Sequence, residues 1–305
     1  MTSTERTAEQ VPGHGPGPEG VNDRAAEPSV AAPRRSGSVL VLLAYAWLLF
    51  IVLAAALADV LPLAPYGTPI GAPRQTPTPG SLDLFLGTDQ LGRSLLSRCV
   101  HGARVSLLVG AGAGLLGATV GAGLGLLAGY FGGKLDALIQ LLADVMLAFP
   151  PLILLLALSS VLTPSTPTIL IGLTVLVVPT FIRLARANTM SWVSREFITA
   201  ARTLGASHRR ILGRELVPNL LPALGAYLPV VMAALIVAEG SLSFLGMGIP
   251  PPTPSWGGMI ADGKDSIGDY PHMVFVPTAF IFLTVFALNQ AGDHLRHRFD
   301  RGLRE

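Results

Sequence analysis

Charged side chains are scarce in this chain of 305 residues, in which Asp, Glu, Lys and Arg together make up 13%. An ordinary soluble domain has roughly 25%, and so few charges cannot coat a water-soluble globule. The formal net charge of +2 argues against a protein that neutralises many nucleic-acid phosphates. A single cysteine, Cys99, excludes an intramolecular disulfide and a cysteine-built zinc or iron–sulfur site. With 50% hydrophobic residues, the composition predicts a membrane protein.

Motifs for nucleotide binding and catalysis are also missing. The nearest approach to a phosphate-binding loop is Gly133-Lys134, but Ala128 replaces its first glycine and Leu135 its hydroxyl residue. No HExxH or GxSxG sequence and no pair of catalytic carboxylates occurs. His294 and His297 lie in an arginine-rich tail, which is typical of a solvated face rather than a metal site. We therefore expect a chain that is not an enzyme and holds no cofactor or metal.

Six apolar runs are long enough to cross a bilayer. A helix needs about 20 apolar residues to span the hydrocarbon core, because lipid cannot satisfy backbone polar groups. The runs cover residues 38–58, 105–131, 137–162, 168–187, 220–247 and 273–291. The sequence predicts an all-α polytopic membrane protein with six transmembrane helices.

The distribution of basic residues predicts an orientation, because Lys and Arg concentrate in cytoplasmic loops. Residues 183–215 carry seven arginines and two glutamates, whereas residues 248–272 carry three aspartates and one lysine. We expect both termini in the cytoplasm. The predicted parts are a disordered cytoplasmic tail (1–37), a first span (38–58), an extracytoplasmic segment (59–104), five helices (105–291) with a cytoplasmic loop (188–219), and a cytoplasmic tail (292–305).

The first apolar run permits a second interpretation. Arg34-Arg35, followed by an apolar stretch that ends Ala56-Leu57-Ala58, looks like a twin-arginine signal peptide with its cleavage site. The apolar region of a signal peptide has about 7–15 residues, and this stretch is longer. We therefore favour an uncleaved first span.

Small residues line one face of the second run. Glycines recur there at every fourth position, which lets two helix backbones approach closely in lipid. This strip serves either packing within the chain or an interface with another subunit. Its members are Gly117, Gly121, Gly125 and Gly129.

Two acidic residues fall inside predicted spans, where ionisable side chains are costly and often functional. Asp144 lies in the third run, and Glu239 lies in the fifth. Each is either a structural hydrogen-bond centre or part of a translocation path. Prolines also interrupt the spans, where they permit kinks around a conduit or only shape the packing. These prolines are Pro150, Pro151, Pro179, Pro222, Pro229 and Pro277.

The basic loop carries the strongest local pattern. Its sequence predicts a first helix over 196–204, a break at Gly205, and a second amphipathic piece over 208–216 that Pro218 closes. A short helix that projects from the membrane and ends in a small-residue turn is suited to a groove of another protein.

At these residues the chain resembles the membrane subunits of binding-protein-dependent ABC importers. Their cytoplasmic loop has the pattern E-A-A-x-x-x-G, followed by nine residues and I-x-L-P. Here Thr199, Ala200 and Ala201 precede Gly205 at that spacing, and Pro218 stands at the expected separation. Thr199 departs from the glutamate of the pattern. The resemblance implies an ATPase-coupling loop that comprises Glu196, Thr199, Ala200, Ala201, Gly205 and Pro218.

Further stretches resemble the C-type subunits of dipeptide, oligopeptide and nickel permeases. These are LGTDQLGR at 86–93, GARVSL at 102–107, LSFLGMG at 242–248 and PTPSWG at 252–257. The resemblance implies the fold of a type I importer and a bacterial inner-membrane location. It also implies four further subunits: a B-type permease, two cytoplasmic ATPases that use ATP and Mg²⁺, and an extracytoplasmic solute-binding protein.

Other functions remain open at this point. Peptides are the favoured solute. Nickel or a nickel chelate is the second candidate, although no cluster of metal-binding side chains falls in a span. A stand-alone transporter would use Asp144 or Glu239 as a coupling-ion site, but no inverted repeat is evident. A membrane-embedded scaffold would leave Gly205 and the basic loop without a role.

Overall fold

A computed structural model describes residues 36–161, 163 and 165–302, and within these residues regular structure is helical apart from two isolated β-bridges. Most of the predicted tail, 1–37, lies outside the described residues. The long helices are α1 (Ser36–Ala56), α2 (Leu95–Phe131), α3 (Gly133–Ala148), α5 (Thr166–Val193), α8 (Val217–Phe244) and α10 (His272–Gly302). The short ones are α4 (Pro151–Val161), α6 (Glu196–Thr203), α7 (His208–Arg210), the π-helical η1 (Ile211–Leu216), α9 (Trp256–Gly263) and the 3₁₀ turn η2 (Lys264–Ser266).

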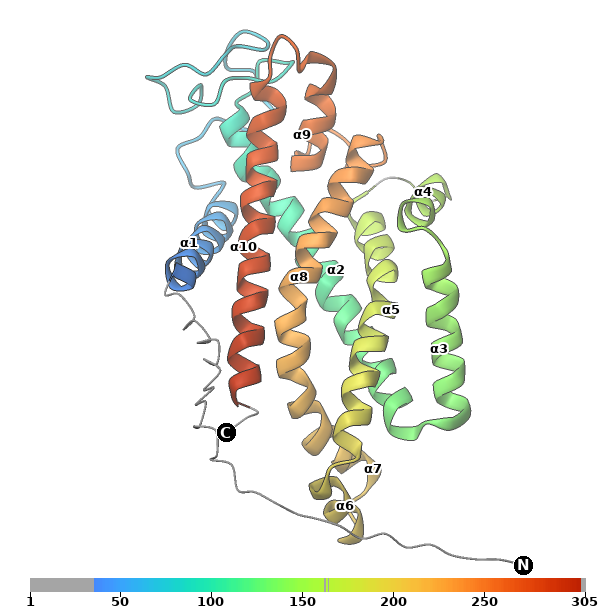
Figure 1. The fold of residues 1–305 in the computed structure, drawn as a ribbon. Helices are drawn as coiled ribbons and strands as arrows, with labels where there is room; N and C mark the ends of the chain where they lie inside the picture. Colours follow the sequence, from blue (N-terminus) through green and yellow to red (C-terminus); the bar gives the residue numbers. More distant parts are fainter. Residues whose placement is uncertain (1–35, 162, 164, 303–305) are drawn as a thin grey trace, which may run out of the picture. The chain divides into compact units, whose positions relative to one another are not determined.

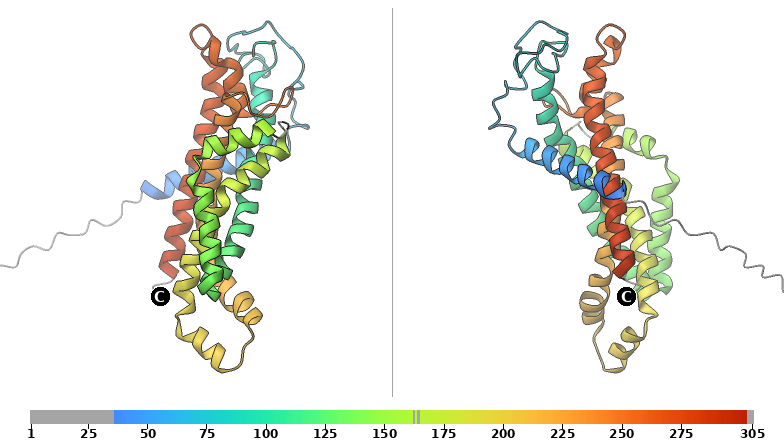
Figure 2. Two further views of the ribbon diagram at one scale, coloured as in Figure 1. Left: turned by 90° about the vertical axis from the view of Figure 1, so that its right-hand side faces the viewer. Right: turned by 60° about the vertical axis from the view of Figure 1, so that its left-hand side comes forward.

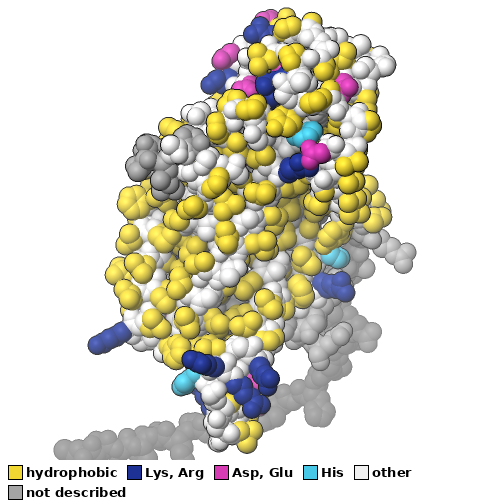
Figure 3. Space-filling model, turned by 180° about the vertical axis from the view of Figure 1, so that it is seen from behind, with side chains coloured by type: hydrophobic (Ala, Val, Ile, Leu, Met, Phe, Trp, Pro, Cys, Tyr) yellow, Lys and Arg dark blue, Asp and Glu magenta, His cyan; other side chains and the backbone are white. Residues whose placement is uncertain are grey.

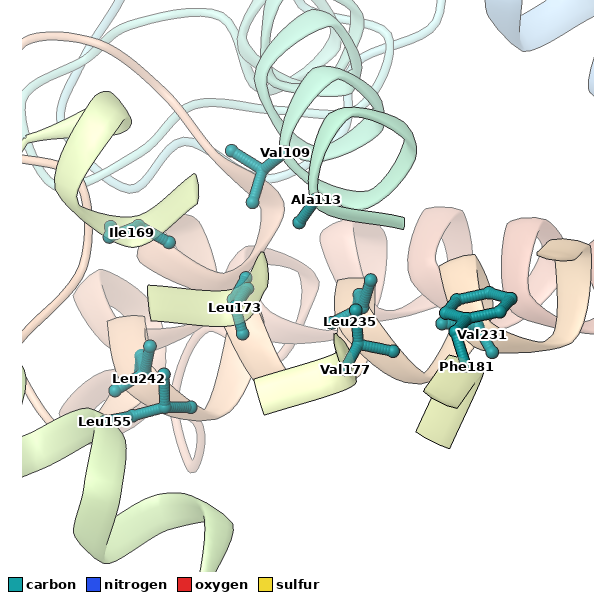
Figure 4. Close-up of a cluster of buried hydrophobic side chains, with 10 residues drawn as sticks. All are labelled: Val109, Ala113, Leu155, Ile169, Leu173, Val177, Phe181, Val231, Leu235 and Leu242. Carbon is teal, nitrogen blue, oxygen red and sulfur yellow. The ribbon is translucent and has the colours of Figure 1, made fainter. Parts of the chain in front are cut away.

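The helices α2, α5 and α8 form the centre of the bundle (Figure 1). Their apolar side chains interdigitate in one cluster, to which α4 adds a single leucine (Figure 4). Phe181 and Leu173 of α5 are fully buried in this cluster. The members drawn in the figure are Val109, Ala113, Leu155, Ile169, Leu173, Val177, Phe181, Val231, Leu235 and Leu242.

The first helix crosses α10 on the outside of the bundle (Figure 2). One polar contact joins the two, because the Trp47 indole N–H donates to Thr284 Oγ1 at 3.1 Å. Most other large side chains of α1 are exposed; Leu42 and Leu43, for example, are 68% and 63% exposed. In a water-soluble protein such a helix would be a liability, whereas lipid accepts it.

The face seen in Figure 3 is apolar around its middle, and most of its charged side chains gather toward the two ends. Five described helices are long and apolar enough to span a membrane, and a sixth span requires that the bent pair α3 and α4 be counted as one. This arrangement agrees with the predicted all-α membrane protein. The third predicted run, in which Pro150 and Pro151 permit a kink, is divided into two helices.

The third span breaks between Ala148 and Pro151, where the two helical pieces meet at 86°. Phe149 is extended (φ −82°, ψ 128°), as expected for a residue that precedes a proline. Without an amide hydrogen, Pro150 and Pro151 cannot continue the hydrogen-bond ladder of α3. The two consecutive prolines predicted a kink at this point. In the structure the chain turns a sharp corner between α3 and α4.

Other helix bounds also differ from the prediction. The second helix begins at Leu95 rather than at 105, because the Ser94 side chain accepts the Ser97 amide and caps it. The last helix continues to Gly302, so the predicted tail 292–305 is helical where it is described. The predicted spans ended where charged residues begin. The helices continue past these residues, because an α-helix can extend beyond the lipid as long as its backbone hydrogen bonds are made.

Candidate functional site: the segment between α5 and α8

Residues 194–218, called here the coupling segment, comprise the connection from α5 to α8 and the first two residues of α8, at the end of the bundle where α2 also ends (Figure 1). Its first helix, α6, places Glu196 in the first turn and Arg202 in the last, as the helix dipole favours. The helix stops at Gly205, whose φ of +79° lies in the left-handed region. The amides of Gly205 and Ala206 donate to the carbonyls of Arg202 and Ala201, each at 3.0 Å. This Schellman-type end confirms the predicted break.

One face of α6 is anchored to the bundle. Ile198 is fully buried in a cluster that also contains Tyr130 at the end of α2, Ile211 and Leu216. Because Ile211 and Leu216 belong to η1, which continues directly into α8, the cluster connects α6 to both α2 and α8. Displacement of α6 would therefore strain two membrane helices.

A polar contact strengthens this attachment. Tyr130 Oη and His208 Nδ1 lie 2.7 Å apart, within hydrogen-bond distance. The Arg202 guanidinium carbon lies 5.3 Å from the centre of the Tyr130 ring, in cation–π range. Tyr130 thus contacts residues on both sides of the Gly205 turn. Tyr130 could not be predicted from the sequence, because nothing along the chain indicates that the end of α2 lies against this loop.

The opposite face of α6 is uncovered. Glu196, Thr199, Ala200 and Gly205 are exposed, and Ala201 is half-buried. Leu204 is 88% exposed at the tip of the turn. The structure therefore brings these predicted residues together on one helix and its turn. Pro218, also exposed, lies instead in the first turn of α8.

The coupling segment is basic. Its arginines are exposed, and none forms a salt bridge with a carboxylate of the described residues. Such a surface favours an acidic partner. The arginines are Arg195, Arg202, Arg209, Arg210 and Arg214.

The two acidic residues of the predicted spans have different surroundings and share no contact. Asp144 of α3 pairs with Arg183 of α5 at 2.7 Å, and both side chains are more than half exposed. Glu239 of α8 is fully buried. Ser243 Oγ donates to its Oε1 at 2.8 Å, and Ser106 Oγ lies 3.5 Å from its Oε2. The structure thus places a surface ion pair on α3 and a serine-lined carboxyl inside the bundle.

A second ion pair, which was not predicted from the sequence, joins α3 and α5. Arg186 donates Nε and Nη2 to the two carboxylate oxygens of Asp136, at 2.5 and 2.7 Å. The spacing of the charged residues could have predicted this pair. Asp136 and Asp144 lie on one face of a helix, and Arg183 and Arg186 lie on one face of another. Two apolar helices with matching charges on one face are predicted neighbours.

The glycine strip of α2 lies against α5. A Cβ atom at any of its four positions would approach an atom of α5 to less than 3.0 Å. At Gly121 the nearest atom is the Val178 carbonyl oxygen, and at Gly129 it is the Thr189 Cβ at 2.8 Å. Backbone contact of this kind is available only to glycine. Of the two interpretations left open, the structure shows packing within the chain.

A charged cluster occupies the opposite end of the bundle. Asp89 accepts the amides of Leu91 and Arg93 at 2.9 and 3.0 Å and the Arg93 Nε at 2.6 Å. Arg98 Nε lies 3.3 Å from Asp89 Oδ2, and Arg98 Nη2 lies 3.6 Å from Asp262 Oδ2. Residues 86–93 carried part of the family resemblance, but their sequence did not show that Arg98 and Asp262 join them.

Comparison with known proteins supports this description. Residues 121–305 match the family described as binding-protein-dependent transport system inner membrane component. The chain is 39% identical over 220 residues to the glutathione transport system permease protein GsiD of Escherichia coli O157:H7, across 72% of this chain and 73% of that protein. The same values hold for GsiD of Shigella sonnei strain Ss046.

Solved structures show the same fold. Two inward-facing crystal forms of the MetNI methionine ABC transporter each match with a TM-score of 0.55. The first is 20% identical and covers 66% of this chain and 95% of the other; the second is 18% identical and covers 67% and 97%. With the family match and the GsiD relatives, these findings place the chain in the inner membrane as a multi-pass protein. The chain belongs to the binding-protein-dependent transport system inner membrane components, the permease subunits of ABC importers.

Proposed function

We propose that this permease subunit imports di- and oligopeptides or peptide-like solutes. Membership of the family implies ATPase and binding-protein partners. We further propose that two ATPase subunits bind the coupling segment and that a second, B-type permease completes the membrane domain. The observation that carries the proposal is the helix α6, which is anchored by Ile198 on one face and uncovered on the other.

The attachment of α6 suggests how force passes into the membrane. An ATPase that binds the exposed face of α6 would move this helix together with the cluster around Ile198. Tyr130 would pass the movement to α2, and the continuous chain of η1 would pass it to α8. In this scheme nucleotide acts by favouring one of two arrangements of the helices, as any ligand of a two-state protein does.

The solute assignment draws on relatives. Proteins 39% identical to this chain are named as permeases for glutathione, which is itself a tripeptide. A cavity of about 280 Å³ lies where the corner between α3 and α4 faces α5 and α8, with Phe149, Thr180 and Tyr227 among its walls. We propose that the path runs along this corner, close to Asp144. Glu239, enclosed by serines, suits the structural alternative.

Substitution of Gly205 tests the coupling role. A β-branched side chain is strained at a φ of +79°, so Gly205→Val should distort the turn. We expect the complex with its ATPases and binding protein, reconstituted in proteoliposomes, to keep ATP hydrolysis and lose peptide uptake at least tenfold, roughly a 1.4 kcal/mol effect. Gly205→Asn should retain more uptake, because asparagine tolerates this region.

Gly213 provides the matched control. It is exposed in η1, has no positive φ, and a Cβ there would meet nothing within 4 Å. Gly213→Val should therefore leave the Gly205 turn intact and reduce uptake much less than Gly205→Val. Normal uptake by Gly205→Val would contradict the coupling role. Uptake by the purified single chain, driven by an ion gradient without nucleotide, would instead support the stand-alone transporter. A nickel salt supplied in place of peptide tests the second solute.

A further inference from the structure

A pocket of about 590 Å³ lies at the end of the bundle opposite α6. The last residues of α8, the proline-rich loop 245–255 and helix α9 form its walls, which are mostly apolar or backbone. Three charged side chains line it: Arg98, Asp262 and Lys264. A space of this size accommodates a small peptide, since ligand pockets commonly measure about 300–1,000 Å³.

Among the three charged residues that line the pocket, Arg98 is unusual because it is buried and incompletely hydrogen-bonded. Its side chain is only 5% exposed, and its Nη1 is buried without a hydrogen-bond partner among the described residues. Its ion pairs to Asp89 and Asp262, at 3.3 and 3.6 Å, leave the guanidinium short of good hydrogen bonds. A buried guanidinium with a free N–H group is costly, and it binds carboxylates well when one is supplied.

The neighbouring carboxylates do not meet this need. Asp89 already accepts three hydrogen bonds, including that from Arg93 Nε. Asp262 is 48% exposed, and burial raises the pKa of its carboxyl group although Arg98 and Arg93 oppose the rise. Neither carboxylate therefore accepts a hydrogen bond from Arg98 Nη1.

Lys264 adds a positive charge that no described carboxylate pairs with. Its ammonium nitrogen lies 5.3 Å from the centre of the Phe244 ring, and it forms no salt bridge in the described part of the chain. With Arg93 and Arg98 it makes three cations against the two carboxylates of Asp89 and Asp262. The cluster thus has a formal surplus of one positive charge.

We propose that this pocket binds the terminal carboxylate of the incoming peptide, with Arg98 Nη1 and the Lys264 ammonium group as donors. The proposal rests on the proposed function, because it assumes a peptide solute that arrives at this end of the bundle. An acidic side chain of the binding protein offers the same chemistry, and the experiment separates the two sources.

The test compares two peptides that differ only in this group. Trialanine and trialanine amide are supplied to the complete importer in proteoliposomes, at concentrations that saturate the binding protein, and initial uptake is measured. Lys264→Ala should reduce trialanine uptake about tenfold and leave the amide unchanged, because one charge-assisted contact is lost. Arg98→Lys keeps the charge beside Asp89 but removes the Nη1 donor, and it should act in the same direction.

Lys134 is the control, since it is exposed at the start of α3 and far along the chain from the pocket. Lys134→Ala should leave the ratio of the two uptake rates as in the wild type. An unchanged ratio in Lys264→Ala, with intact uptake of both peptides, overturns this proposal alone. If Lys264→Ala reduces the uptake of both peptides equally, and the importer in nanodiscs also binds the binding protein more weakly, the carboxylate that the pocket binds belongs to the binding protein. This result would also overturn the proposal. Failure of the wild type to import either peptide overturns the proposed function, and this proposal with it.

Discussion

At the scale of single residues, close helix packing depends on which glycines face a neighbour. Gly125 and Gly123 are two positions apart on α2 and have opposite surroundings. A Cβ at Gly125 would collide with the Ile182 carbonyl oxygen of α5, and it would come within 2.9 Å of Ala185. A Cβ at Gly123 would meet nothing within 4 Å. The same substitution therefore has opposite consequences at the two positions.

We expect Gly125→Ala to lower the free energy of unfolding by about 1–3 kcal/mol, because α5 has to move away from the added methyl group. Gly123→Ala should leave it unchanged or raise it by up to about 1 kcal/mol, since alanine is the better helix former. Thermal unfolding of both variants in the same detergent measures the difference. Equal stability of the two would contradict the packing described for this face.

At the scale of elements, α6 depends on its cluster for its position. Ile198→Ala would leave a cavity beside Tyr130, Ile211 and Leu216, at a cost of about 2–5 kcal/mol to the attachment. We expect faster hydrogen exchange of the α6 amides and little change in α2 and α5. Thr199→Ala, one residue later and exposed, should exchange like the wild type. Unaltered protection of α6 in Ile198→Ala would show that other contacts hold this helix.

The two ion pairs between α3 and α5 differ in solvent exposure. The side chains of Asp136 and Arg186 are 19% and 30% exposed, whereas those of Asp144 and Arg183 are 58% and 54% exposed. Contact with water therefore weakens the attraction between Asp144 and Arg183 more than that between Asp136 and Arg186. Double-mutant cycles on unfolding, with alanine at each position, should give a larger coupling energy for Asp136 with Arg186. A larger coupling for Asp144 with Arg183 would argue that lipid shields that pair from water.

At the scale of the whole molecule, the basic coupling segment predicts the orientation in the membrane, with this segment on the cytoplasmic side. Leu204 of the coupling segment and Val60 of the segment between α1 and α2 are 88% and 80% exposed. In a background with Cys99→Ala, we expect Val60→Cys to react with a membrane-impermeant maleimide added to spheroplasts. Leu204→Cys should react only after the membrane is opened. The reverse labelling pattern would place the coupling segment outside and remove the basis of the proposed function.

Much of this protein could be predicted from local sequence alone. Long uncharged runs require a membrane, since only lipid accepts them, and the cluster of arginines in one loop predicts its side. Gly205 marks a left-handed helix end because other residues are strained there. The motifs around Ala200 and Gly205 identify the family. All of these depend on the local chemistry of consecutive residues.

Only the tertiary structure shows which helices and side chains are neighbours. The glycine strip could face α5 or another subunit, and only the packed bundle shows that it faces α5. Asp144 and Glu239 looked alike in the sequence, yet one is paired at the surface and the other is enclosed by serines. Tyr130, Arg98 and Asp262 gained their significance from partners distant in the chain. Sequence periodicity defines the face of a helix, but the partner of that face depends on the packing of the whole chain.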